Sequence, residues 1–238
     1  MRFQVVIPHR DRGVDPCRRA NLESAVAWWR DCGVDPVVVD DGRAGAEQFN
    51  RSAAYNAGLA ATDADIVVFS EADLLVPIEQ IEEGVFLAHE APGLVVPFSK
   101  FLALDEQASE WVRSRTVTPS EVAPERVQQV RGDRKSIGAV NIVSRETMRL
   151  IGGQYDEKFE GHAYDDDAME RAFSVCCGPT RFVDGPGWHQ YHLPGAFFAT
   201  PDSTEADRAA TEANRVRWGL YRRAGSAERI RELVTGVR

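Results

Sequence analysis

The sequence is poor in cysteine and has no long hydrophobic run. Its four cysteines include the adjacent Cys176 and Cys177, and none stand in a C-x-x-C or metal-site spacing. The longest apolar candidates, such as Ala64–Phe69, have the length of a strand, whereas a membrane span needs roughly 18 apolar residues. The N-terminal MRFQVVIPHR lacks an apolar stretch of signal-peptide length. We therefore expect free thiols, no membrane span, and a cytoplasmic protein.

An excess of positive charge and three common enzyme motifs are also lacking. The 28 Lys and Arg residues face 37 Asp and Glu residues, which gives a net charge of −9 and disfavours non-specific binding of nucleic acid. No G-x-G-x-x-G follows the first apolar run, and neither a G-x-x-x-x-G-K-[ST] nor a G-x-S-x-G motif occurs. These absences argue against Rossmann dehydrogenases, P-loop enzymes and α/β-hydrolases.

Apolar runs that alternate with helical patterns make up most of the chain. Strands are predicted at Phe3–Pro8, Asp35–Asp41, Ala64–Ser70, Gly93–Phe98 and Gly138–Ser144. Helices are predicted at Asn21–Cys32, Phe49–Ala61, Ile78–His89, Arg145–Ile151 and Asp165–Cys176. Continuous Val and Ile runs between helices predict an α/β fold with a mostly parallel central sheet covered on both faces.

Two segments depart from this alternation. Residues from about 103 to 135 have scattered charge and weak periodicity, and we expect a partly helical insertion or mobile loop there. Residues 205–237 are rich in Arg, Ala and Glu, which predicts one or two amphipathic helices. We therefore expect one domain over residues 1–200, with a flexible insertion at about 103–135, and a helical C-terminal extension over 201–238 packed on the same domain.

Polar residues follow the first three predicted strands, where an α/β sheet binds its ligands. The first strand is followed by His9, Arg10 and Arg12, the second ends in Asp40 and Asp41, and the third is followed by Glu71 and Asp73. The carboxylates of Glu71-Ala72-Asp73 are two positions apart and point the same way from an extended backbone, so they are suited to a divalent ion. Alternatively, Glu71 caps the helix at Ile78 and Asp73 faces water.

Two further polar clusters occur later in the chain. Asp165, Asp166 and Asp167 precede or open a helix, where they face a cation or sugar hydroxyls, or serve only as caps and surface residues. A carboxylate there is a candidate general base. His189 and His192, in the sequence WHQYH, either coordinate a metal or pack among the neighbouring aromatics.

The segment Phe49-Asn50-Arg51 opens the helix after the second strand. Arg51 offers a planar fork for a phosphate or carboxylate. Asn50 is suited to the N-cap of the helix, and this capping role alone is an alternative to any contact with a ligand.

Seven segments, taken in order, resemble one family pattern: VVIPHRDR, VVVDDG, FNRSAAYNAGL, VVFSEADLLVP, GAVNIVSRETMRLIGGQYDEKF, YDDDAMER and WHQYH. The pattern is that of the GT-A nucleotide-sugar glycosyltransferases, in the group of the beta-1,4-galactosyltransferases, the polypeptide N-acetylgalactosaminyltransferases and the bacterial chondroitin-type polymerases. The resemblance covers roughly residues 3–195. It implies a GT-A fold, a UDP-sugar donor, and manganese or magnesium as cofactor.

The resemblance also implies a set of nucleotide-sugar contacts. The opening I-P-x-R matches Ile7, Pro8 and Arg10, and implies that this loop receives the uracil and ribose. The F-N-R signature matches residues 49–51, and the G-G-[VA] segment matches Gly138 and Ala139, with Ile137 in place of the first Gly. The full set of expected donor-binding residues is Pro8, His9, Arg10, Arg12, Asp40, Asp41, Asn50, Arg51, Glu71, Ala72, Gly138 and Ala139.

Metal ligands and catalytic residues follow from the same resemblance. The Asp-x-Asp motif matches Glu71 and Asp73, which implies Asp73 as a metal ligand. His189 matches the late metal-binding His, and His192 is the second choice. The motif G-W-G-G-E-D-D-D aligns on Glu160–Asp167, which implies Asp165 as the catalytic base. It likewise implies that Asp166 and Tyr164 contact the acceptor.

The resemblance implies an inverting, metal-dependent transfer of a hexose or N-acetylhexosamine from a UDP-sugar to an acceptor hydroxyl. The acceptor can be a saccharide, a protein or another hydroxyl-bearing molecule. Two alternative functions do not involve glycosyl transfer. One is a catalytically degenerate GT-A domain that binds nucleotide or glycan without transfer. The other is a nucleotidyltransferase, although HRDRGVDP lacks the Gly-rich, Lys-bearing loop typical of that class.

Overall fold

The computed structural model describes the whole chain except residues 12, 14, 46, 134–136, 194–202 and 237–238. The described residues form a central six-stranded sheet in the order β2-β1-β3-β8-β5-β9. Its strands are β1 (Phe3–Pro8), β2 (Val37–Val39), β3 (Ile66–Ser70), β5 (Val95–Val96), β8 (Val140–Ser144) and β9 (Arg181–Phe182). β1 pairs in parallel with β2 and β3, as does β5 with β9, whereas β8 is antiparallel to β3 and β5. The prediction of a mostly parallel α/β sheet is confirmed.

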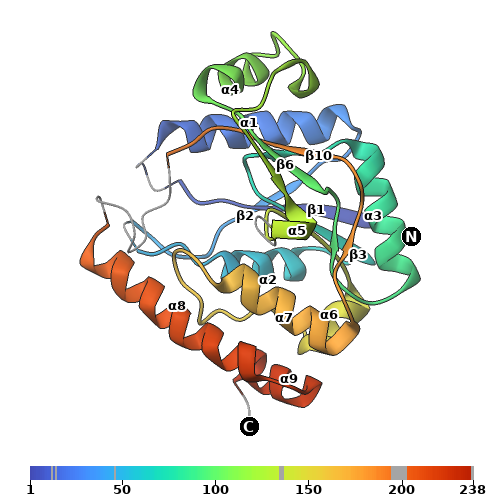
Figure 1. The fold of residues 1–238 in the computed structure, drawn as a ribbon, viewed down its shortest axis with the longest axis vertical. Helices are drawn as coiled ribbons and strands as arrows, with labels where there is room; N and C mark the ends of the chain where they lie inside the picture. Colours follow the sequence, from blue (N-terminus) through green and yellow to red (C-terminus); the bar gives the residue numbers. More distant parts are fainter. Residues whose placement is uncertain (12, 14, 46, 134–136, 194–202, 237–238) are drawn as a thin grey trace.

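Helices cover both faces of this sheet, because successive residues of a strand point to opposite sides. On one face lies α2 (Arg51–Ala61), where Gly58 allows the helix backbone to approach Val6 of β1. On the other face lies α3 (Ile78–Glu90), where a Cβ on Gly84 would come within 2.6 Å of Cδ1 of Ile142. Figure 1 shows α1 (Pro16–Asp31) on the side of α3, and α6 (Arg145–Ile151) and α7 (Asp165–Cys177) on the side of α2.

A second sheet is formed by short strands that the sequence did not predict. Within the described part of the chain its order is β4-β10-β6-β7, with β4 (Leu74–Leu75), β6 (Lys100–Ala103), β7 (Arg126–Gln129) and β10 (Pro186–His189). Strands of two to four residues show too little periodicity to be recognised. The segment from about 103 to 135 contains α4 (Glu106–Arg113), the 3-10 helix η1 (Pro119–Glu121), β7 and α5 (Val130–Asp133). It therefore adds both helix and strand to the fold.

The C-terminal extension is helical, as predicted, and consists of α8 (Glu205–Arg223) and α9 (Ala227–Thr235). α8 contacts α7, and α9 contacts α6 and α7 (Figure 1). Its anchor is Asp156, which is 1% exposed. Oδ2 of Asp156 accepts a hydrogen bond from Nε of Arg217 at 2.5 Å and another from the hydroxyl of Tyr221 at 2.7 Å. A buried ion pair therefore fastens the extension to the domain.

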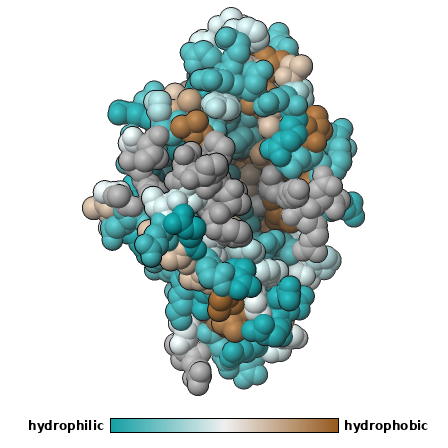
Figure 2. All heavy atoms as spheres, turned by 60° about the vertical axis from the view of Figure 1, so that its left-hand side comes forward, coloured by the Kyte–Doolittle hydropathy of each residue, from teal (hydrophilic) through white to brown (hydrophobic). Residues whose placement is uncertain are grey.

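The molecular surface is mostly hydrophilic on the face shown in Figure 2, where hydrophobic residues form small, separate patches. Exposed large hydrophobic side chains include Phe86, Trp111 and Val216. Within the described residues, no helix combines the length and the apolar character needed to cross a membrane.

Candidate active site

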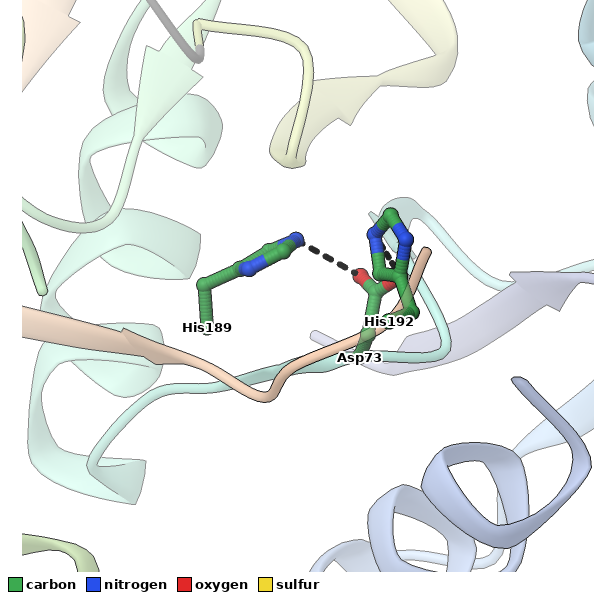
Figure 3. A group of neighbouring side chains, drawn as sticks. All are labelled: Asp73, His189 and His192. Carbon is green, nitrogen blue, oxygen red and sulfur yellow. Dashed lines mark ion pairs between the residues drawn. The ribbon is translucent and has the colours of Figure 1, made fainter. Parts of the chain in front are cut away.

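Three potential metal ligands converge where β4 and β10 pair. Asp73 immediately precedes β4, and His189 ends β10, which runs antiparallel to β4. Nε2 of His189 lies 3.7 Å from Oδ1 of Asp73, and Nε2 of His192 lies 3.2 Å from Oδ2 (Figure 3). The ligand atoms of all three side chains lie within 4.8 Å of one another. We call Asp73, His189 and His192 the metal cluster.

The chemistry of the metal cluster fits a divalent cation. Asp73 is buried, and its Oδ1 has no hydrogen-bond partner among the described residues. A buried carboxylate oxygen without a partner is costly unless a cation compensates it. Nδ1 of His192 lies 2.7 Å from the carbonyl oxygen of Leu193, so Nδ1 donates there and Nε2 is directed to Asp73. One carboxylate and two imidazoles are a donor set used by divalent transition metals.

The electrostatics of the cluster also suit a metal. Burial acts to raise the pKa of Asp73, but the adjacent His189 and the hydrogen bond from His192 lower it below its ordinary value. Burial lowers the pKa of His189. Burial acts in the same direction on His192, but the hydrogen bond and charge of Asp73 raise the pKa of His192 overall. Asp73 is thus ionised and His189 neutral at pH 7, which are the forms that bind a metal.

A second cluster is centred on Arg51, the first residue of α2. Its Nη1 lies 2.5 Å from Oε1 of Glu71. Its Nε and Nη2 lie 2.9 and 2.6 Å from Oδ2 of Asp165, and Nη2 also pairs with Oδ1 of Asp166. Arg51 therefore joins the end of β3 to the first turn of α7. We call these four residues the arginine cluster.

The arginine cluster holds more negative than positive charge. Burial raises the pKa of Glu71 although Arg51 opposes this effect. Burial likewise raises the pKa of Asp166 to about 8, again against Arg51 and with help from Asp165 and Glu71. The carboxylate of Asp166 lies directly over Gly138, at a place that a Cβ on this glycine would occupy. Both hydrogen bonds from Arg51 to Asp165 go to Oδ2, and Oδ1 accepts none from the described residues.

These contacts decide between the alternatives that the sequence left open for Glu71, Asp73 and the acidic cluster. Glu71 does not cap α3, because the N-cap of α3 is Pro77, which makes no side-chain capping bond. Asp73 does not face water, since it is 6% exposed. Asp165 and Asp166 are not caps of α7, because they bind Arg51 and the N-cap is Tyr164.

The loop before α7 is strained and is held by the C-terminal extension. Ala163 and Tyr164 have φ angles of 72° and 71°, which non-glycine residues rarely adopt. Asn214 of α8, only 1% exposed, donates through Nδ2 to the carbonyl oxygens of Glu160, His162 and Ala163 at 2.8, 3.1 and 3.1 Å. Its Oδ1 accepts from the backbone N–H of Glu160 at 3.1 Å. Sequence reasoning missed Asn214, because nothing in the local pattern of α8 distinguishes it.

The loops after β1 and β2 are tied together by an ion pair. Nε of Arg10 lies 2.8 Å from Oδ1 of Asp41, and these side chains are 9% and 0% exposed. Pro8 ends β1, and the backbone N–H of His9 donates to the carbonyl oxygen of Val39 at 2.8 Å. Asp40 is exposed and accepts from the backbone N–H of Gly42. Arg12, also expected to bind the donor, lies outside the described residues.

The remaining residues expected at the donor site line the edge shared by β3, β8 and α2. Asn50 is the N-cap of α2: its Oδ1 accepts from the backbone N–H of Ala53 at 2.9 Å, and its Nδ2 donates to the carbonyl oxygen of Glu157 at 2.7 Å. Ala139 accepts from the backbone N–H of Glu71 at 2.9 Å. Ala72 lies between Glu71 and Asp73 and so connects the two clusters.

Solved structures share this architecture. GalNAc-T7 with UDP, GalNAc and Mn²⁺ matches with a TM-score of 0.57 and 14% identity, covering 92% of this chain and 49% of that one. The chain has a GT-A glycosyltransferase fold. No protein-family model and no curated protein sequence matches the chain.

Two weaker similarities are to other glycosyltransferases. Glucosyl-3-phosphoglycerate synthase from Mycobacterium tuberculosis, with Mn²⁺, UDP and glucosyl-3-phosphoglycerate, has a TM-score of 0.47 and 16% identity over 92% of this chain and 79% of that one. Drosophila beta-1,4-galactosyltransferase 7, with manganese, UDP-Gal and xylobiose, has a TM-score of 0.44 and 17% identity, covering 76% of this chain and 63% of the fly protein. The chain thus spans 63% of the fly protein and about half of GalNAc-T7, and the fold assignment rests on GalNAc-T7.

Proposed function

We propose that the chain is a metal-dependent inverting glycosyltransferase that transfers a hexose or N-acetylhexosamine from a UDP-sugar to an acceptor hydroxyl. The observation that carries this proposal is the metal cluster, with its buried Asp73, which adjoins the arginine cluster at one edge of a GT-A fold. The GalNAc-T7 structure, which has a similar fold, contains UDP, GalNAc and Mn²⁺, and this supports the choice of donor and metal.

Asp73, His189 and His192 are the residues that would hold Mn²⁺ or Mg²⁺. When bound by these residues, such an ion would supply positive charge to offset the negative charge of the leaving diphosphate. The ion pair of Arg10 and Asp41 fixes the loops that, in this proposal, receive the uridine. Because Gly138 has no side chain, the carboxylate of Asp166 can lie directly against it, beside the start of β8.

Asp165 is the proposed general base. Arg51 binds only Oδ2 of this carboxylate and so fixes its orientation, while Oδ1 faces no donor among the described residues. Oδ1 would accept the proton of the acceptor hydroxyl as the hydroxyl oxygen attacks the anomeric carbon from the side opposite the leaving UDP. Asp166 and Tyr164, in the same turn, are proposed to contact the acceptor.

The test is the Asp165→Asn variant, which keeps the shape of the side chain but cannot accept a proton in the same way. We expect normal binding of UDP with Mn²⁺ and a loss of sugar transfer of at least about a hundredfold. Asp167→Asn is the matched control, since Asp167 lies in the same turn and is exposed. Near-normal transfer by Asp165→Asn would contradict the assignment of the base. Metal-dependent UDP binding by the wild type without any turnover would instead favour a non-catalytic binding domain.

A further inference from the structure

Arg18 is a half-buried cation close to the metal cluster. It lies in the first turn of α1, and Nη2 is 3.2 Å from Nδ1 of His192, the one polar contact of its guanidinium within the described part of the chain. No carboxylate among those residues forms an ion pair with it. Because a guanidinium does not lose its proton in a protein, this position carries a permanent positive charge.

The contact with His192 does not give the guanidinium of Arg18 a hydrogen-bond acceptor. Nδ1 of His192 also lies 2.7 Å from the carbonyl oxygen of Leu193, which can only accept a hydrogen bond. Nδ1 therefore carries a proton and donates it to the carbonyl oxygen. The N–H of Arg18 Nη2 thus faces another donor, the N–H of Nδ1, and not an acceptor. The N–H groups of Arg18 consequently remain available to an anion.

The position of Arg18 relative to the metal cluster is fixed by a second contact. Oδ1 of Asp15, the N-cap of α1, accepts from the backbone N–H of Cys17, and Oδ2 accepts from the backbone N–H of Leu193 at 2.7 Å. This bond ties the first turn of α1 to the segment that carries His192. Since Nε2 of His192 faces Asp73, Arg18 lies one imidazole ring away from the nitrogen that would bind a metal.

Arg18 and a divalent cation in the metal cluster would together form a positively charged site suited to a multivalent anion. A divalent metal held by Asp73 and two neutral imidazoles would retain one net positive charge, and Arg18 adds another. A diphosphate supplies more than one negative charge and several acceptor oxygens, and arginine binds phosphate through charge-assisted hydrogen bonds. We infer that Arg18 donates to a phosphate oxygen of the nucleoside diphosphate held at the metal cluster, an inference that rests on the proposed function.

The test is UDP binding to the full chain in the presence of Mn²⁺, measured by calorimetry for Arg18→Met and Arg18→Lys. We expect Arg18→Met to bind UDP about tenfold or more weakly, and Arg18→Lys to recover part of the loss. Arg19→Met is the control, because Arg19 is 72% exposed and pairs with Glu23 on the surface. Thermal unfolding of each variant verifies that it is folded.

A separate titration with Mn²⁺ alone distinguishes phosphate binding from an indirect effect through His192. Unchanged Mn²⁺ affinity together with weaker UDP binding supports the inference. Equal UDP affinity in Arg18→Met and wild type, or a loss of UDP binding that only follows a loss of Mn²⁺ binding, would overturn the inference and leave the proposed function standing. Failure of the wild type to bind UDP at all would overturn both.

Discussion

Replacing Asn214 tests whether the C-terminal extension takes part in the active site. Its Nδ2 is shared by three carbonyl oxygens and its Oδ1 binds one backbone N–H, in a position that is 1% exposed. With two protons on Nδ2, about three of these bonds form at once. A hydrogen bond contributes about 1 kcal/mol net, and an abandoned buried partner costs more, so Asn214→Ala should lower the free energy of unfolding by about 2–4 kcal/mol.

The same change should affect catalysis more than nucleotide binding. Ala163 and Tyr164 keep their positive φ angles only because surrounding contacts hold them, and Asp165 follows directly. Once Asn214 is removed, the loop relaxes and the backbone at Asp165 shifts, although Arg51 still binds the carboxylate of Asp165. We therefore expect kcat for sugar transfer to fall at least about tenfold, while the Kd for UDP stays within about threefold.

Urea unfolding and steady-state transfer measure these two effects. Arg215→Ala is the control, because Arg215 is 56% exposed and pairs on the surface with Glu212, which predicts a change of less than about 1 kcal/mol. Asn214→Ala with wild-type stability, or with lowered stability but an unchanged kcat, would refute the argument that this residue positions the loop.

Three further predictions concern the two clusters and the anchor of the extension. Gly138→Ala should displace Asp166 and reduce sugar transfer at least about tenfold without a change in Mn²⁺ binding. Unchanged transfer would show that the close contact between Asp166 and Gly138 does not matter for catalysis. In the folded protein the pKa of Asp166 is raised to about 8, whereas an aspartate in the unfolded chain loses its proton above about pH 4. Between these two pH values the folded protein holds a proton that the unfolded chain has lost, so Asp166 makes folding less favourable as pH rises. In metal-free protein Asp166→Asn should therefore stabilise more at pH 8 than at pH 5 in urea unfolding, and an equal effect at both would contradict the raised pKa. Arg217→Met should cost about 3–5 kcal/mol because it leaves Asp156 buried without its cation, whereas a loss below about 1 kcal/mol would mean that the ion pair does not anchor the extension.

Elements with a continuous apolar run or a strong helical pattern were predictable from the sequence. β1 is predicted to the residue, because FQVVIP is bounded by a proline and a polar loop. α1 begins at Pro16, five residues before the predicted start, because Asp15 and Pro16 supply an N-cap and a first-turn proline outside the apolar pattern. β4 and β10 were missed, although their pairing is what brings Asp73 to the two histidines.

Part of the candidate site was likewise predictable from the sequence, and part required the fold. The members of the metal cluster were predictable as residue types, but that both histidines reach Asp73 is a property of the fold. Arg51 was expected beside a nucleotide, and its bonds to carboxylates from β3 and α7 required the tertiary structure. Arg18 and Asn214 lie on helices whose local sequence marks neither, since their significance comes only from the segments that pack against them.

The most direct test of the account is Mn²⁺ binding to the purified chain, followed by electron paramagnetic resonance, for the wild type and Asp73→Asn. The metal cluster predicts one site in the wild type, tightened by UDP and weakened at least about tenfold in the variant, because the variant loses the one charged ligand. Binding of equal strength in both proteins, or no Mn²⁺ binding by the wild type with UDP present, would contradict the central claim that Asp73, His189 and His192 form the metal site of a glycosyltransferase.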